Sequence, residues 1–248
     1  MIHRGAMAAE IRTAWLTFVR RRTAVVFTFV FPLLLVVIFG ALVTTDPGDG
    51  GLFTEPTRYY VPGYLAVVVM FTPLSRIGAE VIRHRDANRF EQLSTTPLTP
   101  GRWLLAHTVV NVVLVGIACA IVLVALWIGT GVAVRPSVGL VAFITLGVAM
   151  FCGIGACLGR LASTQDGVIA AANTIAIPML FLAETFVPPR MLPGWFHPLV
   201  ELMPLTPFSR GVRTIVEGGT GVGTDLALLA GLAVVFLLLG ARLLPRVE

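Results

Sequence analysis

The chain contains no lysine, although it has 18 arginines among its 248 residues. A phosphate-binding loop of the P-loop type needs a lysine after its glycines, so the chain cannot itself be a P-loop ATPase or GTPase. Schiff-base chemistry on a lysine amine is excluded for the same reason. Work driven by nucleotide hydrolysis would therefore depend on another polypeptide.

Several other kinds of site are also missing. The three cysteines lie within apolar segments, which does not indicate the disulfide framework of a small secreted protein. The four histidines are scattered, without the spacing of metal ligands. Neither a G-x-S-x-G nor an H-E-x-x-H motif occurs. The sequence thus predicts no catalytic residue, no metal site and no cofactor bound by this chain.

Charged residues are scarce as well. They make up 12% of the chain, whereas 56% is hydrophobic, and an ordinary soluble domain is about 25% charged. A helix needs about 20 apolar residues to cross a bilayer. The sequence offers six such runs, at about 23–43, 59–80, 103–128, 137–158, 168–187 and 226–244. We therefore expect an all-α membrane protein in which residues 1–248 form a single transmembrane domain.

The first of these runs is longer than the 7–15 apolar residues of a cleaved signal peptide, so a retained span is expected. The net charge of +5 would suit nucleic acid. However, the arginines gather at the ends of the apolar runs, where they set orientation. We therefore expect the lipid bilayer, and no nucleic acid, as the surroundings of this chain.

The arginines are divided unequally between the two sides of the six predicted spans. One side holds Arg4, Arg12, Arg20, Arg21, Arg22, Arg76, Arg83, Arg85, Arg89, Arg102, Arg160, Arg242 and Arg246, and the other holds Arg58, Arg135, Arg190, Arg210 and Arg213. Cytoplasmic loops carry the excess of positive charge, so both termini are predicted to be cytoplasmic. An even number of spans requires the same result.

Residues 1–22 are predicted to form an amphipathic helix on the membrane surface. One helical face collects Met7, Ile11, Trp15, Phe18 and Val19, and the other collects Glu10, Thr13, Thr17 and Arg20.

A charged segment of about 22 residues joins the second and third predicted spans. Residues 81–93 read as a helix that Pro97 stops, and Thr99 then caps a new helix with Pro100 at its first position. Two interpretations remain open. The segment is either a solvated loop whose arginines only set topology, or a docking surface for a soluble partner.

The segment 188–224, between the fifth and sixth spans, contains six prolines. Thr206 can cap a short helix that ends at Gly218-Gly219, and Arg213 and Glu217 are spaced as a helical ion pair. A shorter apolar stretch precedes it. We expect two short helices that enter the outer leaflet and return.

Three smaller patterns carry further hypotheses. Glu184 is the one acid within a predicted span, which makes it a functional candidate, although pairing with Arg190 would also explain it. Arg76 and Glu80 are four residues apart and are expected to form an ion pair. The Gly155-x-x-x-Gly159 motif permits close helix packing and is weak evidence for a dimer seam.

Two motifs carry a resemblance to a known family. The first is Arg89-Phe-Glu-Gln-Leu-Ser-Thr-Thr-Pro-Leu98 after the second span. The second is Phe181-Leu-Ala-Glu-Thr-Phe-Val-Pro188, followed by Met203-Pro-Leu-Thr-Pro-Phe208. With the six spans, they resemble an ATP-binding-cassette permease of the type-2 exporter family. Asn88-Arg89 and Ala183-Glu184 replace residues usual in that family.

The resemblance implies a transmembrane subunit that pairs with a second permease, identical or diverged, and with two cytosolic ATPase subunits that bind ATP and Mg²⁺. It implies that a coupling helix between the second and third spans contacts the ATPase, through Arg83, Arg85, Asp86, Arg89, Phe90, Glu91 and Leu93. The substrate pathway is placed at Phe181, Glu184 and Phe186. The short helices at 188–224 become a re-entrant external hairpin.

The expected function is export of a hydrophobic or amphipathic molecule, drug-like or lipid-like, across a prokaryotic plasma membrane. A polysaccharide- or glycolipid-exporting permease of the same family is the main alternative. A stand-alone carrier or channel would need ionisable residues near the midplane of the membrane. A polytopic membrane enzyme would need a nucleophile and base or a carboxylate cluster inside the bilayer. The sequence shows neither.

Overall fold

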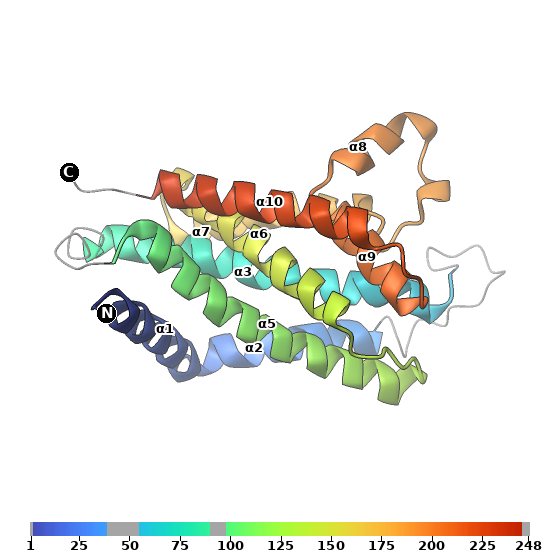
Figure 1. Cartoon of the computed structure of the whole chain (residues 1–248), viewed down its shortest axis with the longest axis horizontal. Helices are drawn as coiled ribbons and strands as arrows, with labels where there is room; N and C mark the ends of the chain where they lie inside the picture. The colour runs from blue at the N-terminus through green and yellow to red at the C-terminus, as the bar shows by residue number, and fades with distance from the viewer. Residues whose placement is uncertain (1, 39–54, 90–97, 245–248) are drawn as a thin grey trace.

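The computed structural model describes residues 2–38, 55–89 and 98–244, which are helical with no strand in these ranges. The elements are α1 (Ile2–Arg20), α2 (Arg22–Val36), η2 (Thr57–Tyr60), α3 (Val61–Asp86), α5 (Pro100–Thr130), α6 (Val138–Leu161), α7 (Gln165–Leu182), η3 (Pro189–Met191), η4 (Gly194–Phe196), α8 (His197–Leu202), α9 (Thr206–Val216) and α10 (Gly223–Leu243). The long helices lie roughly side by side in an elongated bundle (Figure 1).

Five helical segments in the described ranges are long and apolar enough to cross a membrane: Thr57–Asp86, Pro100–Thr130, Val138–Leu161, Gln165–Leu182 and Gly223–Leu243. They coincide with the second to sixth predicted spans. The fifth ends earlier than predicted, at Leu182 rather than residue 187. The first predicted span, 23–43, lies partly outside the described residues, and α2 covers its first part, to Val36.

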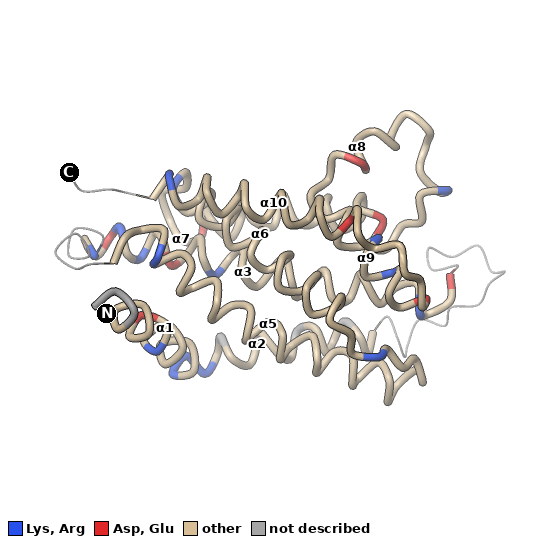
Figure 2. Tube along the Cα trace, viewed as in Figure 1, with Lys and Arg blue, Asp and Glu red and all other residues tan. Residues whose placement is uncertain are grey.

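The two ends of the bundle differ (Figure 1). We call the end that holds α1, the last turn of α3 and the last turn of α10 the inner end. The end that holds α8 and α9 is the outer end. Most charged residues lie toward one end or the other, with apolar helix between them (Figure 2). This distribution fits a bundle whose middle lies in hydrocarbon.

Helix α6 packs against α3 on one side and α10 on the other through glycines. A Cβ on Gly159 would lie 2.5 Å from the carbonyl oxygen of Gly78, and a Cβ on Gly155 would lie 2.7 Å from that of Leu74. A Cβ on Gly153 would lie 2.4 Å from the backbone of Phe236 in α10. The Gly155-x-x-x-Gly159 motif therefore makes a seam with α3 of the same chain. The hypothesis of a dimer seam at this motif is wrong, because α3 covers it.

The predicted N-terminal helix is present as α1, but its faces differ from the prediction. Phe18 is buried with Val110 and Leu114 of α5. Val19, placed on the apolar face by periodicity, is 48% exposed. Glu10, placed on the polar face, is bonded to His107 of α5. Because Glu10 bonds to His107, the face of α1 that carries Glu10 is directed toward α5. Helical periodicity alone does not predict this contact.

One of the two predicted helix starts is confirmed. The hydroxyl of Thr99 accepts a hydrogen bond from the backbone N–H of Arg102, and Pro100 is the first residue of α5. At α9 the prediction is wrong. Thr206 is the first helical residue, not the cap, and its hydroxyl donates to the carbonyl oxygen of Val200 at 2.6 Å. That bond ties α8 to α9.

Candidate functional site

The outer end contains a buried acid held by two arginines of another helix. Glu184 follows the last turn of α7, is 6% exposed, and has a left-handed backbone with φ of 57°. Arg210 of α9 donates from Nε to both carboxylate oxygens of Glu184, each at 3.1 Å. Arg213, one turn later, donates to the backbone carbonyl of Glu184. The predicted partner Arg190 instead pairs with Glu55.

The same arginines reach two further segments. Arg210 also donates from Nη1 to Glu201 of α8 at 3.0 Å. The guanidinium of Arg213 lies 4.0 Å from the centre of the Tyr59 ring in η2, a cation–π distance. No ion pair between Arg213 and Glu217 occurs among the described residues, so the predicted helical pair is wrong and Arg213 faces Glu184 instead.

We call Glu184, Glu201, Arg210 and Arg213 the outer ion-pair cluster. Hydrogen bonds from Arg210 lower the pKa of Glu201. Hydrogen bonds to Glu184, and to a smaller extent to Glu201, raise the pKa of Arg210 above its ordinary value. The cluster thus joins the end of α7 to α8 and α9, and its charges largely neutralise one another.

The two aromatic residues proposed for the substrate pathway lie near Glu184. Phe186 is buried and occupies the space opposite Gly63, where a Cβ would lie 2.9 Å from its ring. Its ring centroid is 6.1 Å from that of Tyr64 and 6.4 Å from that of Phe181. Phe181 is 48% exposed on α7. The structure therefore gathers the three proposed residues at the outer part of α3 and α7.

The residues assigned to coupling begin on α3 itself, which continues without interruption to Asp86. Arg83 forms an ion pair with Glu80. Arg85 donates to the carbonyl oxygens of Ala162 and Ser163, at 3.0 and 2.8 Å. These carbonyls belong to the turn between α6 and α7. Arg85 therefore links the inner end of α3 to that turn.

The helix predicted over residues 81–93 is not separate from the second span, because its first half is the last turn and a half of α3. Asn88 follows with a left-handed backbone, φ 50°, which ends the helix. Asp86 and Arg89 are exposed. Phe90, Glu91 and Leu93 lie outside the described residues.

A cavity of about 650 Å³ opens beside the inner half of α3. It is lined by Ala14, Thr17, Phe18, Arg21, Thr28, Phe71, Thr72, Ser75, Arg76, Ala79, Glu80, Arg83, His107, Ile169 and Asn173. These residues come from α1, α2, α3, α5 and α7, except Arg21, which lies between α1 and α2. The lining combines aromatic rings with hydroxyls, an amide and charges, which is the mixed character of a site for an amphipathic molecule.

Arg76 forms one wall of this cavity. It donates to Oδ1 of Asn111 at 3.4 Å and to the carbonyl of Ala14 at 3.5 Å, and its guanidinium lies 4.6 Å from the centre of the Phe18 ring. The predicted Arg76–Glu80 pair is therefore wrong, because Glu80 pairs with Arg83. Sequence reasoning missed the cavity. Its signal was the run of Thr72, Ser75, Arg76 and Glu80, which puts polar groups on one face of an apolar helix.

A second missed feature is a cluster of aromatic rings that includes His107 from the wall of this cavity. The ring centroid of Trp103 lies 4.3 Å from that of His107 and 5.0 Å from that of His84. Nε2 of His107 lies 3.1 Å from Oε1 of Glu10, and this hydrogen bond lowers the pKa of Glu10. With Glu10, this ring cluster joins α1, α3 and α5 close to the residues that the sequence assigned to coupling. Single histidines far apart in sequence gave no sign of it.

Comparisons with known proteins cover most of this architecture. The model of the ABC-2 type transporter family matches residues 7–216, from α1 to the last residue of α9. The chain is also similar to the daunorubicin resistance ABC transporter permease protein DrrB1 of Streptomyces coeruleorubidus. The two are 27% identical over 209 residues, which cover 78% of this chain and 72% of that protein.

Proposed function

Because the chain belongs to the ABC-2 type transporter family, we propose that it is the transmembrane subunit of an ATP-driven exporter of drug-like or lipid-like molecules. It is a multi-pass membrane protein of the permease type. Two cytosolic ATPase subunits and a second permease complete the proposed complex, with ATP and Mg²⁺ bound by the ATPases. The proposed location is a prokaryotic plasma membrane.

The cavity beside α3 is the observation that carries the cargo proposal. Its aromatic and hydroxyl lining suits an apolar molecule with a few polar groups. The relative DrrB1 is described as a daunorubicin resistance permease, which favours the same class of cargo. On this proposal the cargo enters at the inner half and leaves past Phe181, Glu184 and Phe186.

The coupling proposal follows from the bonds of Arg85. A push on residues 83–93 would move the inner end of α3, and the bonds from Arg85 to Ala162 and Ser163 would carry the displacement to the turn between α6 and α7. Since α3 and α7 both line the cavity, their movement would change its shape. In this proposal, the helices of this chain transmit the movement driven by ATP hydrolysis in the partner to the cavity that holds the cargo.

Replacing Phe90→Ala, Glu91→Arg and Leu93→Ala together should weaken capture of the partner ATPase at least about tenfold, a loss of about 1.4 kcal/mol of binding free energy. ATP-driven export of fluorescent daunorubicin from vesicles should fall in parallel. The matched control is Arg160→Gln, an exposed arginine on the same side outside the segment. Unchanged capture and export in the triple variant would refute the coupling assignment.

We further propose six spans with both termini in the cytoplasm, α1 on the inner membrane surface, and the η3–α9 region as a re-entrant hairpin in the outer leaflet. Cysteines introduced at Asp49 and Gly218 should react with a membrane-impermeant maleimide added to intact cells, and one at Asn88 should react only after lysis. Cys119 and Cys152 are buried, and the partly exposed Cys157 is replaced by serine in all variants to keep the background small. Labelling of the Asn88 variant from outside would reverse the orientation.

A further inference from the structure

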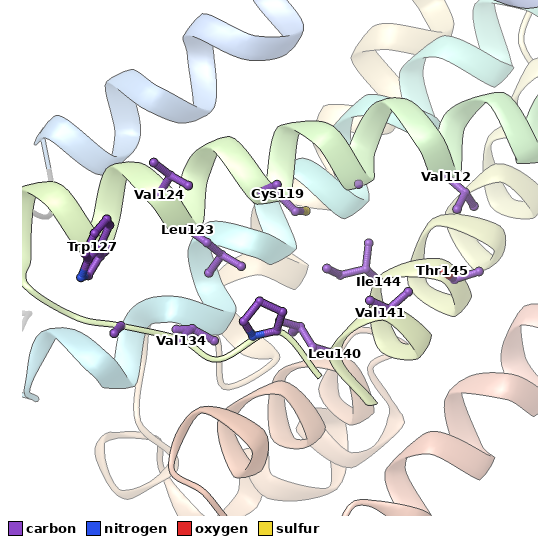
Figure 3. A pocket seen from close by; sticks show the side chains of 14 residues that line it. Val112, Cys119, Leu123, Val124, Trp127, Val134, Leu140, Val141, Ile144 and Thr145 are labelled. Atoms are coloured by element: carbon purple, nitrogen blue, oxygen red, sulfur yellow. The ribbon is translucent and has the colours of Figure 1, made fainter. Parts of the chain in front are cut away.

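An apolar groove runs between the outer halves of α5 and α6. Its volume is about 420 Å³. Figure 3 shows Cys119, Leu123 and Trp127 on α5 facing Val134 of the connecting segment and Leu140 and Ile144 of α6. This groove is separate from the cavity beside α3 and from the outer ion-pair cluster.

The floor of the groove is open because its residues are small. Gly116 and Ala120 both line it. A Cβ added at Gly116 would meet no atom within 4 Å. Thr145 and the indole N–H of Trp127 are among the few polar groups along it. In a membrane, such a surface is covered by lipid or by another apolar helix.

The dimensions favour a lipid chain over a helix. The residues of α5 that border the groove run from Val112 to Trp127, a distance of about 22 Å along the helix. That length exceeds one leaflet but is less than the roughly 30 Å of the hydrocarbon core. A helix of about 10 Å diameter could insert only some of its side chains into a groove of about 420 Å³. An acyl chain is thinner than a helix, and it can lie within such a groove along its whole length.

A cation lies where the head group of that lipid would be. Arg135 is exposed and sits between Val134 and Pro136, which both line the groove. Among the residues that the structure describes, no carboxylate pairs with Arg135. Trp127, 59% exposed, lies at the same end. Tryptophan prefers the membrane interface, and an arginine guanidinium fits a phosphate.

We propose that this groove binds one acyl chain of an anionic phospholipid whose phosphate is held by Arg135. The lipid would fill the gap between α5 and α6 and anchor the segment that connects them. The proposal rests on the membrane location of the chain and is independent of the cargo and of the coupling assignment.

Native mass spectrometry of the full-length chain, purified with equimolar phosphatidylglycerol and phosphatidylcholine, tests the proposal. We expect about one phosphatidylglycerol retained per chain, preferred about tenfold over phosphatidylcholine, which equals about 1.4 kcal/mol. Gly116→Leu should lower this retention about tenfold by filling the floor. Arg135→Gln should reduce retention of phosphatidylglycerol to that of phosphatidylcholine. Both lipids carry a phosphate, but in phosphatidylcholine a choline cation offsets its charge, so only the net negative lipid gains from the guanidinium.

Gly231→Leu on α10 is the matched control, because a Cβ there also meets open space; it should retain lipid as the wild type does. Thermal unfolding of each variant shows whether the fold is preserved, and Ala120→Leu provides a second way to fill the groove. Equal retention of the two lipids by the wild type would overturn the proposal. Unchanged lipid retention in folded Gly116→Leu and Ala120→Leu would overturn it as well. A change in the oligomeric state of these variants without a change in lipid retention would also overturn it and would assign the groove to a second copy of the chain. Loss of export in other variants would leave this result unaffected.

Discussion

Gly159→Ala should destabilise the bundle by about 1–3 kcal/mol, the typical cost of overpacking a tightly packed interior. The added Cβ would lie 2.5 Å from the carbonyl oxygen of Gly78, and backbone cannot yield as a flexible side chain does. Gly155→Ala, whose Cβ would lie 2.7 Å from the carbonyl of Leu74, should behave alike. Unfolding of the purified chain in increasing SDS, followed by tryptophan fluorescence, measures the loss.

Gly231→Ala provides a control of opposite sign. A Cβ at Gly231 meets no atom within 4 Å, so the substitution should leave stability unchanged or raise it by about 0.4–1 kcal/mol through the unfolded state. The seam between α3 and α6 would be wrong if Gly159→Ala matched the control. If Gly159→Ala instead impaired dimer formation and left chain stability unaltered, the Gly155-x-x-x-Gly159 motif would be an interface between two copies of the chain.

Glu184→Ala should cost about 3 kcal/mol of stability, at the low end for removing one partner of a buried ion pair. The loss leaves Arg213, whose side chain is 12% exposed, without its carboxylate neighbour. Arg210 retains its ion pair with Glu201 in this variant, which limits the loss of stability. Export should fall as well, because the end of α7 would be tied to α9 only by the bond from Arg213 to the backbone carbonyl of residue 184. The SDS titration measures the loss of stability, and the vesicle assay measures the loss of export.

Glu201→Ala is the matched control, since Glu201 pairs with the same arginine but its side chain is 62% exposed. An exposed pair is worth about 0–1 kcal/mol, so this variant should stay close to the wild type. Equal losses in the two variants would contradict the view that burial distinguishes Glu184. Glu184→Gln, which retains the shape, then separates the contribution of charge from that of packing.

The outer ion-pair cluster and the bonds of Arg85 lie at opposite ends of α7. At the outer end Glu184 ties the end of α7 to α9, and at the inner end Arg85 ties α3 to the turn before α7. Helix α7 is therefore held at both ends by polar contacts. Conformational change in the proposed exporter would have to loosen at least one of them, which makes these contacts places where a transport cycle can be arrested.

The prediction of polar contacts from spacing failed in a consistent way. Arg76 and Glu80, and likewise Arg213 and Glu217, have the separation of helical ion pairs. Yet Arg76 bonds to α5, and Arg213 bonds to Glu184 just after α7. Spacing along one helix reports which side chains share a face. It does not report what a neighbouring helix brings to that face. In a bundle with an apolar middle, a buried guanidinium takes the partner that the packing supplies.

The sequence by itself determined the class of this protein: helical, membrane-spanning and without a P-loop lysine. Long apolar runs must form helices in hydrocarbon, because every backbone N–H and C=O must be paired within the segment. The motifs around residues 89–98 and 181–208 also indicated the family that the match over residues 7–216 shows. Only the tertiary structure decided which helices meet. The glycine seam and the cavity beside α3 join residues far apart in sequence, whereas the outer ion-pair cluster and the groove on α5 join neighbouring segments. In each case, formation depends on the packing of complementary surfaces that no local pattern specifies.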